Sequence, residues 1–254
     1  MGYIDSKINN IVIISCQEDR NYSGNIRFER SIRDAALYPI FKYFKCAKNS
    51  KINNNSYNPN NLKHEKRNEV VIRALGGDGV VLENKRLQSL LCSLGFWVKD
   101  NHNKNYFGLA DDCYVPGAQA YLIPDSIDTI LFIEDLIEVS SNGVHLCHSG
   151  INSHVECGYV EALNGFAAEG EAGVFTDIVI SSMIGIGGDS GGPAFSYKQD
   201  QKYVSLNGIF NFVLGNFING TLSEIFSGST TINSILSSVS DDINITIPTV
   251  SKTQ

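Results

Sequence analysis

The sequence predicts an all-β fold, a sandwich or barrel, for the chain after residue 69. Short runs of apolar and β-branched residues alternate there with clusters of Gly, Asn and Asp, a pattern typical of strands separated by turns. The runs recur at near-regular spacing, as they do in sandwiches and barrels. The expected strands cover residues 70–74, 90–98, 130–132, 154–163, 177–183, 194–197, 204–212 and 221–226, and a helix capped by Thr230 or Thr231 is expected over 231–239.

The first part of the chain has a different character. An apolar, β-branched run at 11–15 predicts a buried strand, and helical spacing over 26–45 predicts a helix that Pro39 kinks or splits. Residues 51–73 are rich in Asn and have almost no apolar side chains to bury, which indicates a linker. We therefore expect an α/β segment at 1–50, a linker at 51–73 and the main domain at 74–254.

Composition excludes several classes of function. The formal net charge is −7 and the isoelectric point is about 5.2, so neither nucleic acid nor an anionic membrane is an expected partner. The sequence has no run of about 18 apolar residues, so no membrane span is expected. The N-terminus lacks the apolar region of a signal peptide. The six cysteines form no CxxC pair, so we expect no structural metal and no cofactor. The oligomeric state is left open.

The run GGDSGGPAF, residues 187–195, carries the most specific chemistry. Acyl transfer by a serine requires an activated hydroxyl, a base that takes its proton, and donors for the developing oxyanion. Ser190 is the candidate nucleophile, and the amides of Gly188 and Ser190 are the candidate oxyanion donors. The alternative is a glycine-rich turn between two strands without catalytic meaning.

GDSGGP resembles the nucleophile motif of the chymotrypsin-like serine endopeptidases, and other segments match that family in order. CSLGFWV at 92–98 is similar to the strand that opens the first barrel, and FGLADDC at 107–113 to the TAGHC segment. LCHSGINSHVECGYV at 146–160 resembles the CxSGxxTxxxCG hairpin of the streptogrisin and α-lytic subgroup and its fungal relatives. The resemblance covers about residues 74–254.

This resemblance implies the trypsin-like fold: two six-stranded antiparallel barrels, the first one incomplete, with the site between them. It implies a polypeptide as substrate or ligand, secretion, and a pro-region that would correspond to residues 1–50. The implied disulfides are Cys92–Cys113 and Cys147–Cys157, and the pairing of the remaining Cys16 and Cys46 is left open.

The catalytic residues of the family are only partly present. Asp112 stands where the resemblance places the general-base histidine. A carboxylate with an ordinary pKa of about 4 is a poor acceptor for a serine proton, and loss of a triad histidine lowers turnover by about 10⁶. None of the other histidines has the position of the base: they are His64, His102, His145, His148 and His154.

Asp128 is the candidate for the acid that orients the base, because DTILF resembles the family's aspartate strand. Only 14 residues separate it from Cys113, fewer than is usual in the family. The alternative is that the true aspartate strand is deleted and that Asp128 is a turn residue.

The expected substrate-binding residues also differ from the family. Asn211, Phe212 and Val213 replace the Ser-Trp-Gly or Ser-Gly-Gly run that holds the substrate backbone, and Val213 would narrow the pocket. Ile184 stands six residues before Ser190, where an aspartate would select Lys or Arg, so trypsin-like specificity is not expected.

The sequence thus predicts a serine endopeptidase homologue that is weak or inactive. The alternatives are an active endopeptidase that uses another base such as His102, a protein-binding pseudoprotease without catalysis, and an eroded gene product without a selected role.

Overall fold

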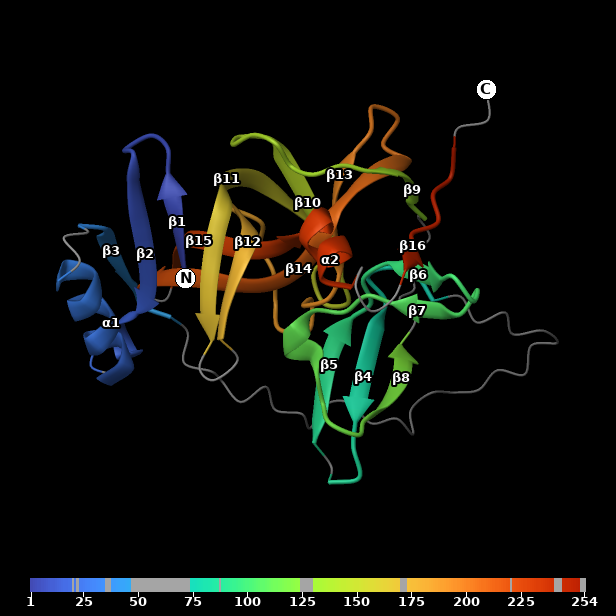
Figure 1. The fold of residues 1–254 in the computed structure, drawn as a ribbon, viewed down its shortest axis with the longest axis horizontal. Coiled ribbons are helices and arrows are strands. Elements are labelled where there is room, and N and C mark those ends of the chain that lie inside the picture. Colours follow the sequence, from blue (N-terminus) through green and yellow to red (C-terminus); the bar gives the residue numbers. More distant parts are fainter. Residues whose placement is uncertain are drawn as a thin grey trace.

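The computed structural model describes residues 1–19, 21, 23–34, 38–46, 74–86, 88–123, 130–169, 173–219, 221–239 and 244–251. Within these ranges the chain is built mainly from antiparallel strands (Figure 1). No described helix is long and apolar enough to cross a membrane. The all-β prediction is confirmed for the main domain.

Six strands of the second half pair into a closed ring. Each strand is antiparallel to its neighbours, and a pairing between the first and last strands closes the ring. The Pro193 end of one strand follows the nucleophile loop directly, so the ring holds that loop in place. In ring order the strands are β10 (His145–Gly150), β13 (Pro193–Tyr197), β14 (Tyr203–Ile218), β15 (Thr221–Thr231), β12 (Gly173–Ser181) and β11 (His154–Glu169).

Strands of the first half form two three-stranded sheets, one of which also includes a strand near the C-terminus. One has the order β5 (Ser89–Ser93), β4 (Gly79–Glu83) and β8 (Gln119–Ile123), and the other has β16 (Ile245–Thr246), β6 (Trp97–Asp100) and β7 (Asn105–Phe107). A further strand, β9 (Phe132–Leu136), runs parallel to β14.

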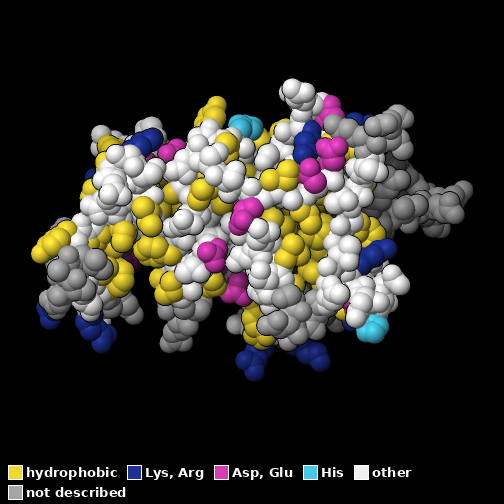
Figure 2. All heavy atoms as spheres, turned by 45° about the horizontal axis from the view of Figure 1, so that its top comes forward, with side chains coloured by type: hydrophobic (Ala, Val, Ile, Leu, Met, Phe, Trp, Pro, Cys, Tyr) yellow, Lys and Arg dark blue, Asp and Glu magenta, His cyan; other side chains and the backbone are white. Residues whose placement is uncertain are grey.

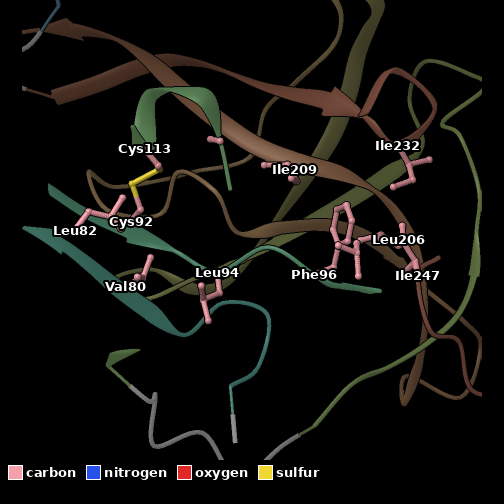
Figure 3. Packing of buried hydrophobic residues seen from close by; sticks show 12 residues of the cluster. Val80, Leu82, Cys92, Leu94, Phe96, Cys113, Leu206, Ile209, Ile232 and Ile247 are labelled. Carbon is pink, nitrogen blue, oxygen red and sulfur yellow. A yellow bond between two sulfur atoms is a disulfide. The ribbon is translucent and has the colours of Figure 1, made fainter. Parts of the chain in front are cut away.

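A shared hydrophobic core joins the two halves. Figure 3 shows side chains from both halves meeting in one cluster. Burial of this cluster fixes the position of one half against the other, and so shapes the cleft between them. The cluster includes Val80, Leu82, Leu94 and Phe96 from the first half, Leu206, Ile209 and Ile232 from the second, and Ile247 near the C-terminus.

The N-terminal segment packs against the main domain. Its strands β1 (Gly2–Asp5), β2 (Asn10–Cys16) and β3 (Ile40–Phe44) continue the large sheet, because β1 pairs with β11. The long β11–β12 hairpin provides the free edge for this pairing. Side chains of both parts fill one core cluster, in which the rings of Phe44 and Phe226 lie 5.9 Å apart. Whether 1–50 is a pro-region stays a prediction.

Two expected helices have different outcomes. The helix expected over 26–45 is only half right: α1 (Ser23–Asp34) ends early and β3 follows Pro39. Proline disfavours helical backbone in the residue before it, and the IFKYF run is rich in residues that favour strands. The C-terminal helix is present as α2 (Ile232–Val239), and its cap is Thr231, whose Oγ1 accepts the amide of Ser234 at 3.2 Å.

The boundaries of several strands in the structure differ from those expected from the sequence. The strand expected over 11–15 lies within β2, but the run 90–98 is divided between β5 and β6, where the amide of Gly95 bonds Gly108 O instead of a neighbouring strand. Strands β4, β7 and β8 were not expected, and most of the strand expected at 70–74 lies outside the described residues.

The described residues contain three disulfides. Cys92–Cys113 and Cys147–Cys157 are present as expected, with Cα atoms 6.1 and 4.0 Å apart. Cys16–Cys46 is also formed, and this settles a pairing that the sequence left open. Parallel pairing of β2 with β3 places Cys16 opposite Phe44, two residues from Cys46, and this register could not be deduced from spacing.

Candidate active site

The nucleophile loop is held by a buried carboxylate. Asp189 has no exposed surface, and its Oδ1 accepts the amides of Asn152 and Ser153 at 3.0 and 3.1 Å. Its Oδ2 accepts the amide of Ile186 at 2.7 Å. Three backbone donors thus satisfy the carboxylate without a basic side chain among these contacts, and they fix the backbone immediately before Ser190.

Glycines set the turn on either side of the serine. Gly188 and Gly191 have φ of +105° and +97°, which only glycine adopts without strain. None of the hydrogen bonds among the described residues uses the amide of Gly188 or Ser190, so both donors remain available to an incoming oxygen. Their convergence on one oxyanion stays a prediction.

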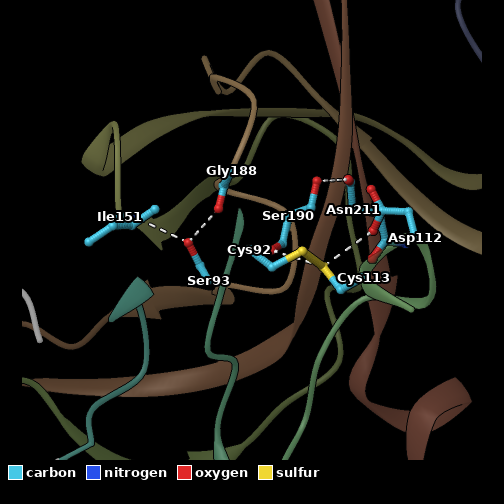
Figure 4. The surroundings of a disulfide bond; sticks show 8 residues. All are labelled: Cys92, Ser93, Asp112, Cys113, Ile151, Gly188, Ser190 and Asn211. Atoms are coloured by element: carbon cyan, nitrogen blue, oxygen red, sulfur yellow. Dashed lines mark hydrogen bonds between the residues drawn. A yellow bond between two sulfur atoms is a disulfide. The ribbon is translucent and has the colours of Figure 1, made fainter. Parts of the chain in front are cut away.

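The serine hydroxyl is occupied by a backbone carbonyl. Ser190 Oγ donates to Asn211 O at 2.8 Å, and no hydrogen bond among the described residues joins Ser190 to a histidine. Asp112, in a 3-10 turn over Asp111–Cys113, lies beside this pair. Its Oδ1 is 3.7 Å from Cys113 Sγ, and Ser190 O is 3.5 Å from the same sulfur (Figure 4). The fold therefore brings Asp112, Asn211 and Ser190 together.

The other proposed participants are not placed at the serine. Asp128 and His64 lie outside the described residues. His102 is exposed between β6 and β7, and His145 and His154 are exposed on the β10–β11 hairpin. Among the described residues, one cluster has the size of a metal site, His145 with Cys147 and Cys157, but its cysteines form a disulfide and offer no thiolate.

His148 is a buried group that the sequence did not single out. It has no exposed surface, its ring stacks on Phe210 with centroids 4.0 Å apart, and its Nε2 lies 2.7 Å from Ile184 O. Since a carbonyl only accepts, Nε2 carries the proton, and Nδ1 is left buried without a partner. Burial lowers the pKa of His148, although the Ile184 carbonyl and the charges of Asp189 and Glu156 oppose that shift.

This burial predicts a pH-dependent stability. The folded state holds His148 neutral while the unfolded chain protonates it at an ordinary pKa of about 6.5. Stability is therefore complete above about pH 6.5 and falls as the pH decreases toward the lowered pKa, with a slope of at most about 1.4 kcal/mol per pH unit. Urea unfolding between pH 5 and 7 should show this slope in the parent and in His102→Gln, but not in His148→Leu. An unchanged slope in His148→Leu would exclude the assignment.

Aromatic side chains stand against the walls expected to bind substrate. Ile184 is 46% exposed at the mouth, but the Phe210 ring reaches the adjacent wall, where a Cβ on Gly185 would lie 2.5 Å from its Cζ. The Phe212 ring covers Gly228 so closely that a Cβ there would overlap it. Both rings therefore pack closely against glycines, and a side chain at Gly185 or Gly228 would displace them. The part played by Phe210 was not foreseen, because its contacts are set by the pairing of β14.

A cavity of about 650 Å³ lies beside Asp112 and Asn211, and Ser190 is not among its described lining residues. Its described lining contains two carboxylates and no Lys, Arg or His, together with a larger apolar surface. Asn211, the partner of the serine hydroxyl, lines it. The polar lining residues are Asp111, Asp112, Thr176, Asn211, Thr230, Ser234 and Ser238, and the apolar part includes Leu109, Val174, Phe175, Ile209, Phe212 and Ile235.

The architecture and the nucleophile loop define a class of fold: the chain has the fold of the chymotrypsin-like serine proteases. It is similar over 69% of its length to 99% of Thermobifida fusca Protease A, with a TM-score of 0.51 and 19% identity. Nocardiopsis protease NAPase matches equally well, at a TM-score of 0.51, 18% identity and coverages of 69% and 99%. Cellulomonas bogoriensis chymotrypsin matches at 0.50 and 17% identity, with coverages of 70% and 99%. No protein-family model and no curated protein matches the sequence.

Proposed function

We propose that this chain is a serine endopeptidase homologue that holds polypeptide in the cleft but, with its own residues alone, hydrolyses peptide bonds weakly or not at all. The observation that carries the proposal is the 2.8 Å hydrogen bond from Ser190 Oγ to Asn211 O. A backbone carbonyl does not take the proton away, so the hydroxyl is satisfied but not activated. Asp112 lies beside it, and a carboxylate is a poor base for this step.

The preserved loop supports binding and electrostatic stabilisation. The free amides of Gly188 and Ser190 suit an oxygen that gains negative charge, and Asp189 holds them in place. Figure 2 shows hydrophobic side chains gathered near the middle of one face with acidic ones among them, and Lys and Arg mostly toward its edges. Such a mixed surface suits a polypeptide better than a polyanion.

The proposal extends to location and subgroup. Three disulfides are typical of an oxidising compartment and support an extracellular protein. The β10–β11 hairpin with its disulfide supports kinship with the streptogrisin and α-lytic subgroup. Pairing of β1 with β11 supports a pro-region role for residues 1–50, which would template the β11–β12 hairpin during folding.

We expect the purified protein to hydrolyse an activated ester slowly, and a histidine-free peptide amide not measurably. An oxyanion hole and binding alone accelerate hydrolysis about 10³–10⁴-fold over water. This acceleration is measurable with an activated ester, whose leaving group needs no proton, whereas the leaving amine of an amide must be protonated. A fluorophosphonate probe should label the parent far more slowly than an active serine protease, and Ser190→Ala not at all. Rapid Ser190-dependent cleavage of the amide would show that another base is present. Ester hydrolysis unchanged by Ser190→Ala would remove the serine from the proposal.

A further inference from the structure

We infer that the substrate supplies the missing base. The site cleaves polypeptides that carry a histidine on the acyl side of the scissile bond, as the second residue before that bond. The inference rests on the proposed function, because it requires a polypeptide in the cleft and a serine that the chain itself does not activate.

The space for an incoming imidazole lies beside Asn211, the hydrogen-bond partner of the serine. The 650 Å³ cavity falls in the usual range of ligand pockets, about 300–1,000 Å³. Asn211 lines it, and the carbonyl of Asn211 is the present acceptor of the Ser190 proton. An imidazole that enters the cavity beside this carbonyl can replace it as acceptor, and the ring nitrogen is a true base at neutral pH.

The lining is suited to hold that ring. Asp112 lines the cavity and lies next to the Ser190 loop, where its carboxylate can accept the N–H of the ring nitrogen that does not face the serine. Such a contact selects the tautomer, orients the ring and stabilises the imidazolium that forms. Asp111 adds a second negative charge, and the described lining holds no cationic side chain to oppose it. Asp112 is thus a positioning residue that acts through the imidazole of the substrate.

The proton balance requires the histidine to be on the acyl side. The imidazole takes the Ser190 proton as Oγ bonds to the carbonyl carbon, and it then gives that proton to the departing amine as the C–N bond breaks. The acyl-serine must next be hydrolysed, when the same imidazole takes a proton from water and returns it to Oγ. A histidine on the leaving fragment would depart after the first step, so only an acyl-side histidine permits turnover.

The extended form of a bound peptide selects the residue. Side chains alternate along an extended chain. The residue just before the scissile bond is the one that the resemblance places between Ile184 and Val213. Its predecessor then points to the opposite side, toward the cavity at Asp112. The inferred substrate therefore has histidine as the second residue before the scissile bond.

The test compares acetyl-His-Ala-para-nitroanilide with its Gln-Ala counterpart. We expect the histidine compound to be hydrolysed at least about 100-fold faster, the lower end of general-base effects, and only when Ser190 is present. Its rate should rise with pH through the titration of imidazole at about pH 6.5. Asp112→Asn should move that titration to lower pH, since a nearby carboxylate raises the pKa of an imidazole; a purely structural role for Asp112 would not move it.

The outcomes separate the inference from the proposed function. Binding of both compounds to Ser190→Ala by calorimetry, with equal slow hydrolysis by the parent, overturns the inference and leaves the proposed function intact. Absence of binding overturns both. Equally fast Ser190-dependent hydrolysis of the two compounds overturns the inference and shows a base within the chain. In a longer peptide whose histidine follows the scissile bond, acyl-Ser190 should accumulate after one turnover, and continued turnover would contradict the acyl-side requirement.

Discussion

Asp112→His is expected to raise the hydrolysis of a histidine-free peptide para-nitroanilide by about 10²–10⁴-fold, the range of general-base catalysis. The new imidazole would arise from the 3-10 turn that lies against the Cys92–Cys113 disulfide, next to the Ser190 loop. The amides and the turn of that loop are already in place, so the base is the part that is missing. Steady-state kinetics at pH 8 measure the gain, and Ser190→Ala in the same background must abolish it.

A matched control comes from the neighbouring residue. Asp111→His places the same side chain one position earlier in the same exposed turn, and we expect no gain. Equal gains in both variants would show that the loss of a negative charge, and not the position of the new imidazole, raises the rate. The size of the gain also tests Asp128: if its carboxylate orients the new imidazole, then Asp128→Asn in the Asp112→His background lowers the rate. If the aspartate strand is deleted, the gain stays small and Asp128→Asn has no effect.

Phe44→Ala is expected to lower the free energy of unfolding by about 3–5 kcal/mol, as is usual for a buried phenylalanine. Phe44 is 2% exposed, and its ring packs on Phe226 of β15 in a core that both parts of the chain share. Phe28→Ala, at a position 46% exposed on α1, is the matched control and should change stability little.

The number of steps in the urea unfolding curve also tests how the N-terminal segment is joined to the main domain. Because β1 pairs with β11 and the core is continuous, urea should unfold the N-terminal segment and the main domain in one transition, and Phe44→Ala should shift all of it. Two transitions, of which Phe44→Ala moves only the first, would show instead that the N-terminal segment unfolds as a unit of its own.

Local features of the site were predictable because they depend on local backbone requirements. Gly188 and Gly191 adopt positive φ wherever such a turn forms, so GDSGGP indicated the loop without knowledge of its surroundings. The partner of the hydroxyl was not predictable. Ser190 meets Asn211 because β14 and the loop are packed together, and the serine could be assigned a chemistry but not an acceptor.

The sequence by itself determined the strand-and-turn texture of the main domain, the serine on its glycine turn, and the absence of a histidine before Cys113. Each is a property of a few adjacent residues. The tertiary structure decided the rest: β1 joined to β11, Cys16 bonded to Cys46, His148 buried against Phe210, and a cavity left beside Asp112. These features depend on strand register and on which surfaces meet, and both are set by contacts between residues far apart in the chain, which no local pattern encodes.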